Sequence, residues 1–95
     1  MFQLQIQNDG ESVVVPVIRD SLTIGRKEGN AIRLTEKNVS RRHAKLIKYN
    51  GKVYVEDIGS SYGTRVNGER IKGRTELQSG DVVSIGDYRL ILMAG

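Results

Sequence analysis

Turn-forming residue pairs divide this sequence into short apolar runs, which leaves little room for long helices. Asn50-Gly51 separates two such runs, residues 44–49 and residues 52–58. Both positions of a two-residue hairpin turn need a positive φ, which Asn and Gly tolerate, so this pattern predicts a β-hairpin. Asn67-Gly68 and the Gly80-Asp81 pair give further turn signals. Turn signals at such short intervals are typical of an all-β domain.

Alternation of apolar and polar residues predicts half-buried strands between these turns. Near the N-terminus, Phe2, Leu4 and Ile6 alternate with glutamines, which is the period of a strand with one wet face. Residues 13–18 form a β-branched run that is interrupted by Pro16. Because proline cannot donate a ladder hydrogen bond, Pro16 indicates an edge strand or a bulge. The pattern as a whole predicts about ten short strands in a β-sandwich.

Candidate binding residues gather in three turn-rich segments, residues 27–30, 35–42 and 59–64. Loops on a rigid β scaffold are where binding residues usually lie. Gly25 frees Arg26 from the end of a strand, and a guanidinium offers forked donors that suit phosphate oxygens. Taken alone, this pair favours a solvated arginine at a strand end over a phosphate ligand.

A second candidate is the run Ser40-Arg41-Arg42-His43, which lies just before an apolar strand. A hydroxyl and adjacent guanidinium groups together suit a dianionic phosphate. His43 is the only histidine, and a lone histidine beside a core strand is more often a structural hydrogen-bonding group than a catalyst. The alternative is a basic loop without a ligand.

Several catalytic and cofactor-binding functions lack their residues. With one histidine and no cysteine, we expect neither a metal site nor a hydrolase. Gly63 and Gly68 have the spacing of a phosphate-binding loop, but Glu69 stands where that loop needs a lysine. The sequence therefore predicts no enzyme and no cofactor.

The charge balance favours an anionic partner. The chain has 15 Lys and Arg against 11 Asp and Glu, a net charge of +4. Such an excess also occurs on ordinary solvated surfaces, and it keeps a nucleic-acid binder open as an alternative. A nucleic-acid binder would show steep salt dependence and aromatic stacking platforms, yet the chain has one Phe and no Trp. No leader and no membrane span is evident, so we expect a cytoplasmic protein without nucleic-acid or membrane partners.

Taken in order along the chain, these segments resemble the forkhead-associated (FHA) family. Each motif is weak alone, but the ordered set within an all-β pattern is specific, and the resemblance runs over residues 22–93. The motifs that carry it are Gly25-Arg26, then Ser40-x-x-His43, then Ser61-x-Gly63-Thr64, then Asn67-Gly68. The resemblance implies a two-sheet antiparallel β-sandwich of ten to eleven strands, with the ligand site in the loops at one end. Residues 1–95 would form a single such domain, as one module of a longer protein.

The resemblance also implies roles for individual residues. Arg26 and Ser40 match the family's phosphate ligands, and Arg41 stands where a further contact to phosphate or peptide often occurs. Ser61 matches a loop residue that helps to hold the phosphorylated side chain. Gly25 and His43 match structural positions, and His43 would brace the loops by hydrogen bonds without touching the ligand. The residues that match those shaping the loop and the small pocket for the threonine methyl are Gly63, Thr64, Asn67 and Gly68. Arg42 has no assignment from the resemblance.

The implied function is phosphothreonine-dependent recognition of a partner protein in signalling, with the phosphorylated segment in another chain or in the same one. One residue departs from the family pattern, because Tyr62 stands where the family usually has an Asn that grips the ligand backbone. A tyrosine hydroxyl cannot replace both the donor and the acceptor of an amide. We therefore expect Tyr62 in the phosphopeptide site, with either a weaker backbone grip or packing against the ligand. A phosphate-independent interaction or dimerisation domain on the same fold stays open as an alternative.

Overall fold

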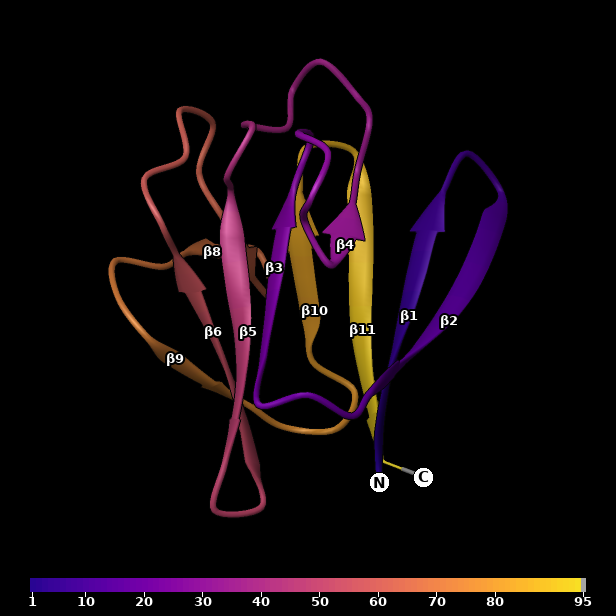
Figure 1. Cartoon of the computed structure of the whole chain (residues 1–95), viewed down its shortest axis with the longest axis vertical. Coiled ribbons are helices and arrows are strands. Elements are labelled where there is room, and N and C mark those ends of the chain that lie inside the picture. The colour runs from indigo at the N-terminus through magenta and orange to yellow at the C-terminus, as the bar shows by residue number, and fades with distance from the viewer. Residues whose placement is uncertain (95) are drawn as a thin grey trace.

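The computed structural model describes residues 1–94, which form strands and no helix. The strands are β1 (Phe2–Asn8), β2 (Glu11–Val17), β3 (Ser21–Gly25), β4 (Ile32–Arg33), β5 (Ala44–Tyr49), β6 (Lys52–Asp57), β7 (Arg65–Val66), β8 (Glu69–Arg70), β9 (Thr75–Leu77), β10 (Val82–Ile85) and β11 (Tyr88–Ala94). Two sheets face each other as a β-sandwich (Figure 1). The predicted sandwich of ten to eleven strands is confirmed. Within the described chain there is no helix that could cross a membrane.

The two sheets have six and five strands. Their orders are β2-β1-β11-β10-β7-β8 and β4-β3-β5-β6-β9. Every pair is antiparallel except β3 with β4, in which Ile24 lies opposite Ile32 in a parallel register. The loop after β3 folds back along the sheet edge, where the Ala31 N–H donates to Thr23 Oγ1 at 3.2 Å. Strand β4 then runs beside β3 in the same direction, and this is the one departure from the predicted antiparallel arrangement.

Alternate residues of both sheets form the core. The fully or almost fully buried apolar side chains include Leu4, Ile24, Leu46, Val53, Val55, Val83, Ile85, Leu90 and Leu92. Each such side chain stabilises the fold by about 1.5–3 kcal/mol relative to exposure. This shared core holds the two sheets together and fixes the loops at their ends.

Two tight turns connect neighbouring strands in the way that the sequence favours. Asn50 and Gly51 have φ values of 52° and 73°, which confirms the predicted hairpin between β5 and β6. Asp9 and Gly10 make a similar turn between β1 and β2, with φ values of 50° and 78°. Strand β2 lies at the edge of its sheet, so the edge position predicted from Pro16 is also confirmed.

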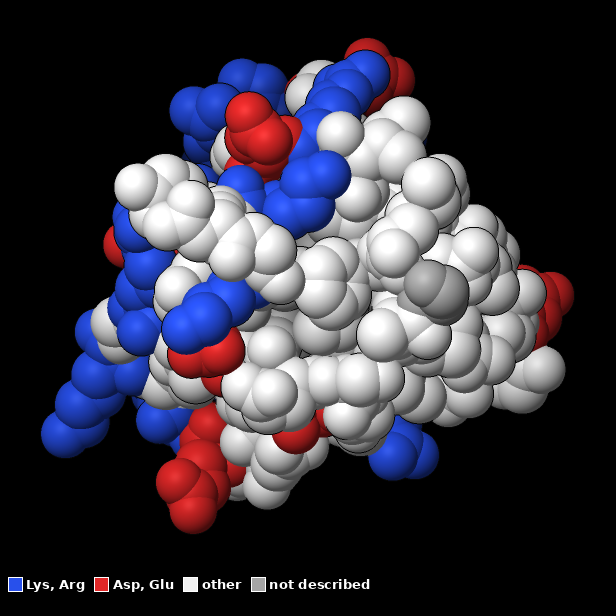
Figure 2. Space-filling model, turned by 90° about the horizontal axis from the view of Figure 1, so that it is seen from below, with Lys and Arg blue, Asp and Glu red and all other residues white. Residues whose placement is uncertain are grey.

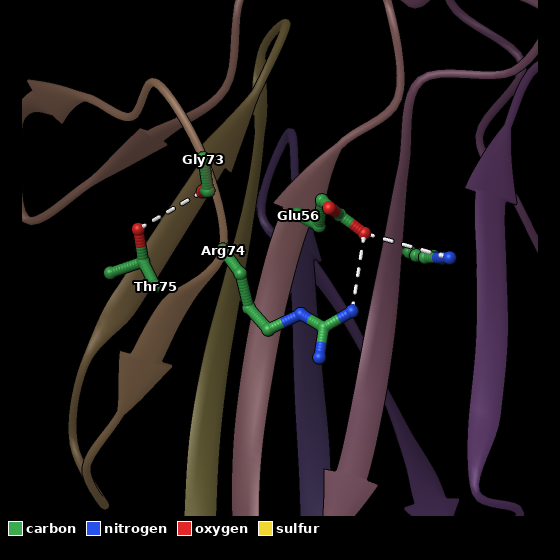
Figure 3. Close-up of polar contacts among 5 residues, drawn as sticks. Glu56, Gly73, Arg74 and Thr75 are labelled. Carbon is green, nitrogen blue, oxygen red and sulfur yellow. Dashed lines mark hydrogen bonds and ion pairs between the residues drawn. The ribbon is translucent and has the colours of Figure 1, made fainter.

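A small charged cluster lies on the five-stranded sheet (Figure 3). Glu56 on β6 pairs with Lys45 Nζ on β5 at 3.5 Å and with Arg74 Nη2 at 3.9 Å. These are the only ion pairs among residues 1–94. Because the three side chains are partly exposed, the cluster adds little stability. Arg74 is thus the one arginine among residues 1–94 that pairs with a carboxylate.

The two ends of the sandwich differ in character. The upper end in Figure 1 carries the three loops that follow β3, precede β5 and follow β6. The opposite end is seen in Figure 2, where a broad central area is uncharged. A hollow of about 530 Å³ at that end is lined in part by Phe2, Ile18 and Tyr49. The three loops that follow β3, precede β5 and follow β6 therefore lie at the end of the sandwich away from this uncharged area.

Candidate functional site

Residues 39–43, here called the central segment, form the centre of the site, because they run between the loop after β3 and the loop after β6. On one side the Arg26 N–H donates to Ser40 O at 3.0 Å, and the Lys27 N–H donates to Arg41 O at 3.2 Å. On the other side the Ile58 N–H donates to His43 O at 3.1 Å. These bonds continue the sheet order β3-β5-β6 beyond the ends of the strands. The order of the strands in this sheet therefore places the three loops next to one another.

Gly25 allows the first of these close approaches. A Cβ atom at this position would lie 2.2 Å from the carbonyl oxygen of Arg41 and 3.0 Å from Asn30 Nδ2. The Asn30 amide itself donates to Lys27 O at 2.7 Å and to Arg41 O at 2.9 Å. Any larger residue would push the segment that carries Ser40 and Arg41 away from β3.

Arg26 is held by its Nε atom and exposes the rest of its guanidinium. Its Nε–H donates to Val39 O at 3.0 Å. The two Nη groups have no protein partner within the described part of the chain, and the side chain is exposed. The carbonyl of Arg26 accepts a hydrogen bond from Arg33 Nε at 3.0 Å, which helps to fix the backbone. This arrangement points four N–H donors outward at a defined place.

A chain of hydrogen bonds through His43 links the central segment to the loop after β6. The Ser40 N–H donates to His43 Nδ1 at 3.0 Å, so Nδ1 is unprotonated and Nε2–H donates to Gly63 O at 2.8 Å. The Ser61 N–H donates to Ser40 Oγ at 2.9 Å. The imidazole is fully buried. His43 is therefore a brace between two loops, and the hydrogen of the Ser40 hydroxyl is left for a ligand.

An open hollow of about 480 Å³ lies over this junction. It is lined by Arg26, Val39, Ser40, Arg41, Arg42, Ile58, Gly59, Ser61 and Tyr62. The structure thus brings together all five residues that the sequence assigned to the ligand. None of the lining residues is acidic, and none of the three arginines has an ion-pair partner among residues 1–94. The hollow can accept a compact, doubly charged anion.

The residues assigned to structural roles lie outside this hollow. Thr64 is fully buried, and its hydroxyl donates to Asp57 Oδ2 at 2.7 Å. Gly63 is buried within the loop after β6 and has a φ of 90°. Asn67 is directed away from the site: its side chain bonds Asp81 Oδ1 and the Val82 N–H, each at 3.0 Å. Asn67 and its neighbour Gly68 therefore fix the turn between β7 and β8 and do not line the hollow.

Asp57 organises the loop after β6, a role that the motifs did not reveal. Its Oδ1 accepts the N–H groups of Gly59 and Ser60, both at 2.9 Å. Its Oδ2 accepts the hydroxyls of Ser60 and Thr64. The sequence did contain a signal, because an Asp followed two residues later by Gly commonly bonds the backbone ahead of it.

The hydrogen bonds to Asp57 make the loop sensitive to acid. Partial burial raises the pKa of Asp57, but the bonds from Ser60, Thr64 and Gly59 outweigh it, so the pKa lies below its ordinary value. A lowered pKa contributes stability above the unfolded-state value of about 3.9, and this contribution is lost as the pH falls through the folded-state value. The free energy of unfolding should therefore fall between pH 5 and pH 3. Urea denaturation at both pH values measures that loss.

An Asp57→Asn variant should show a smaller loss between the two pH values than the parent. It should also be about 1–2 kcal/mol less stable at pH 7, because its amide nitrogen cannot accept the two hydroxyl hydrogens. Some acid sensitivity should persist, since bonds from Gln78 and Asn67 also lower the pKa of Asp81. The matched control is Asp87→Asn, whose exposed carboxylate has no hydrogen-bond partner among residues 1–94. Identical losses in the parent and the Asp57 variant would contradict the assignment.

Sequence comparison finds curated relatives over most of this chain. The chain is 42% identical over 77 residues to an oxoglutarate dehydrogenase inhibitor of Corynebacterium diphtheriae, a match that covers 81% of this chain and 53% of that protein. The chain spans about half the length of the curated relatives it matches.

Solved structures with the same fold cover nearly the whole chain. The FHA domain of FhaA, solved in complex with the intracellular domain of Rv3910, is 28% identical and superposes with a TM-score of 0.85, covering 97% of this chain and 99% of that one. Mycobacterium tuberculosis EmbR, in complex with a low-affinity phosphopeptide, is 30% identical with a TM-score of 0.87, covering 99% of this chain and 25% of that one.

The family model described as FHA domain matches residues 22–86, which is more than half of the chain. The matched stretch includes all the loops that meet at the hollow. This chain belongs to the FHA domain family.

Proposed function

We propose that this FHA domain binds a partner protein, or a segment of its own longer chain, that is phosphorylated on threonine. The observation that carries the proposal is the convergence of three loops on one hollow. Arg26 contributes unpartnered Nη donors there, and Ser40 and Ser61 contribute hydroxyl groups. No acidic side chain lines the hollow to compete with an anion.

The ligand chemistry follows from these donors. A phosphothreonine carries a charge of about −1.5 to −2 and three strong acceptor oxygens. Hydrogen bonds between charged partners are about twice as strong as neutral ones. An unphosphorylated threonine offers none of these contacts, so the phosphate acts as the switch for binding. A micromolar affinity requires only about −8 kcal/mol, and a few charged contacts on a preformed site can supply it.

Binding without catalysis fits the site. The only histidine is buried, and both of its ring nitrogens are engaged with backbone groups of Ser40 and Gly63. A general base must reach the proton that it removes, and His43 reaches no exposed hydroxyl. The phosphopeptide complex of EmbR, a similar fold, supports the same type of ligand. The proposed role is therefore to bring a phosphorylated partner to the protein that contains this domain.

Titration with matched peptides tests the proposal directly. Fluorescence anisotropy would compare peptides that carry phosphothreonine, phosphoserine or threonine at one position in an otherwise identical sequence. We expect binding of the phosphothreonine peptide and none of the threonine peptide. Burial of the single methyl group is worth about 0.8 kcal/mol, so phosphoserine should bind several-fold more weakly. Equal binding of all three peptides would instead favour a phosphate-independent interaction domain.

Replacing Tyr62 with Asn should strengthen phosphopeptide binding. Tyr62 is 58% exposed at the rim of the hollow, so its replacement should leave the fold intact. An Asn there supplies both a donor and an acceptor to the ligand backbone. One or two added hydrogen bonds of about 1 kcal/mol each correspond to a gain of about fivefold or more. Anisotropy with the phosphothreonine peptide measures the change.

Tyr49→Asn is the matched control, since Tyr49 is a comparably exposed tyrosine at the opposite end of the sandwich. This control should bind the phosphothreonine peptide as the parent does. Weaker binding by the Tyr62→Asn protein would show that the tyrosine ring packs against the ligand, contrary to the expected gain.

A further inference from the structure

A second, smaller hollow adjoins the proposed phosphate site on its β3 side. It has a volume of about 200 Å³ and is lined by Lys27, Glu28, Gly29, Asn30 and Arg42. Arg42 lines both hollows, so they share one wall. Residues 39–43 lie between this second hollow and Tyr62. On one side they bond to Arg26 and Lys27 of the loop after β3, and on the other side they bond to the loop after β6, which carries Tyr62. The phosphate site is thus flanked by charged side chains on its β3 side and by the aromatic ring of Tyr62 on the other side.

The charges of the two hollows exceed what one phosphate can neutralise. Together they are lined by four cations, Arg26, Lys27, Arg41 and Arg42, and by one carboxylate, Glu28, which leaves a charge of +3. A single phosphothreonine brings about −1.5 to −2. None of the four cations has an ion-pair partner among residues 1–94. Filling the first hollow therefore leaves a charge of about +1 to +1.5 over the two hollows, and Lys27 and Arg42 outnumber the one carboxylate, Glu28, in the second.

The backbone of the second hollow is held in a fixed arrangement. The Asn30 amide spans two carbonyls, those of Lys27 and Arg41, at 2.7 Å and 2.9 Å. The Lys27 N–H also bonds Arg41 O at 3.2 Å. The loop that presents Lys27 is thus tied to the segment that presents Arg42. Because the backbone on both sides is fixed, binding does not have to order the loops that carry Lys27 and Arg42.

We propose that Lys27 and Arg42 form a second anion subsite, which takes a carboxylate or a second phosphate group next to the phosphothreonine in the same ligand segment. This inference rests on the proposed function and deepens it. The partner would carry an acidic or doubly phosphorylated sequence, with the second anion on the flank that lies over β3 and not on the flank that faces Tyr62.

The test uses four peptides against the whole domain. One peptide has phosphothreonine with neutral residues on both flanks, two have acidic residues on one flank or the other, and one has a second phosphothreonine. We expect an acidic residue on one flank only to tighten binding by about two- to fivefold, as is typical of exposed ion pairs. A second phosphate should tighten it by about tenfold, because its charge is larger and its bonds are charge-assisted. Both gains should shrink at high salt.

Two variants locate the effect. In Lys27→Ala/Arg42→Ala the ratio of affinities for acidic and neutral flanks should fall to about one. Arg19→Ala/Lys52→Ala removes the same charge from exposed residues outside both hollows, and it should keep the parent's ratio.

The outcomes separate this inference from the proposed function. If the neutral phosphothreonine peptide binds but acidic flanks give no gain, the second subsite is wrong while the proposed function stands. The same conclusion follows if the gain persists in Lys27→Ala/Arg42→Ala. If no phosphorylated peptide binds the parent, the proposed function itself fails, and the second subsite fails with it.

Discussion

Replacing Arg26 with Ala should reduce phosphothreonine-peptide affinity by about 30- to 150-fold, because a loss of about 2–3 kcal/mol is expected when one partner of a hydrogen-bonded charge pair is removed. Arg26 holds the end of its guanidinium free over the hollow while its Nε anchors on Val39 O. The fold should be nearly unaffected, because the side chain is exposed and makes only that one hydrogen bond. Isothermal calorimetry gives the affinity, and urea denaturation gives the stability.

Two further variants sharpen this test. Arg19→Ala removes the same charge from an exposed residue that does not line the hollow, and it should bind as the parent does. Arg26→Lys keeps the charge but loses the forked geometry and the Nε anchor, so its affinity should lie between those of the parent and Arg26→Ala. If the folded Arg26→Ala protein binds the phosphopeptide as tightly as the parent, Arg26 is not a phosphate ligand.

Most of the fold was predictable because its signals are local. The alternation of residues 2–7 and the Asn50-Gly51 pair each determine the backbone over a few residues, and both predictions are confirmed. Pro16 identified an edge strand for an equally local reason, the absence of an N–H group.

Three of the shortest strands were not predicted, since two or three residues carry no recognisable period. Strands β7 and β8 have two residues each, and β9 has three. They are held by pairing with neighbours that lie elsewhere in the sequence, such as β10 for β7 and β6 for β9. The parallel pairing of β4 likewise depends on how its loop folds back, which no residue type specifies.

The site shows the same division between local and long-range information. The sequence named five of the nine residues that line the hollow, but the spacing of Arg26, Ser40 and Ser61 along the chain does not show that they meet. That meeting follows from the strand order β3-β5-β6, which places their three loops side by side. Asp57 is the exception: its bonds lie within its own loop and its spacing to Gly59 was a local signal, but none of the motifs includes it.

Replacing Gly25 with Ala should destabilise the domain and also weaken phosphopeptide binding. The new Cβ would lie 2.2 Å from the backbone oxygen of Arg41, which must move by about 1 Å or more to reach a normal contact distance. Overpacking of this kind costs about 1–3 kcal/mol, whereas the lower entropy of the unfolded Ala chain returns only about 0.4–1 kcal/mol. The cost of the clash should outweigh the entropic gain, so the free energy of unfolding should fall by about 1–2 kcal/mol.

The binding defect has a separate cause, because the displaced segment carries both Ser40 and Arg41. A shift of about 1 Å is enough to spoil a preorganised site, so affinity should fall even at temperatures where the variant is fully folded. Gly73→Ala is the matched control: a Cβ there meets nothing within 4 Å and the φ is ordinary, so the variant should be as stable as the parent or slightly more so. If Gly25→Ala matched Gly73→Ala in both stability and affinity, close contact between β3 and the central segment would not be what holds the three loops over one anion.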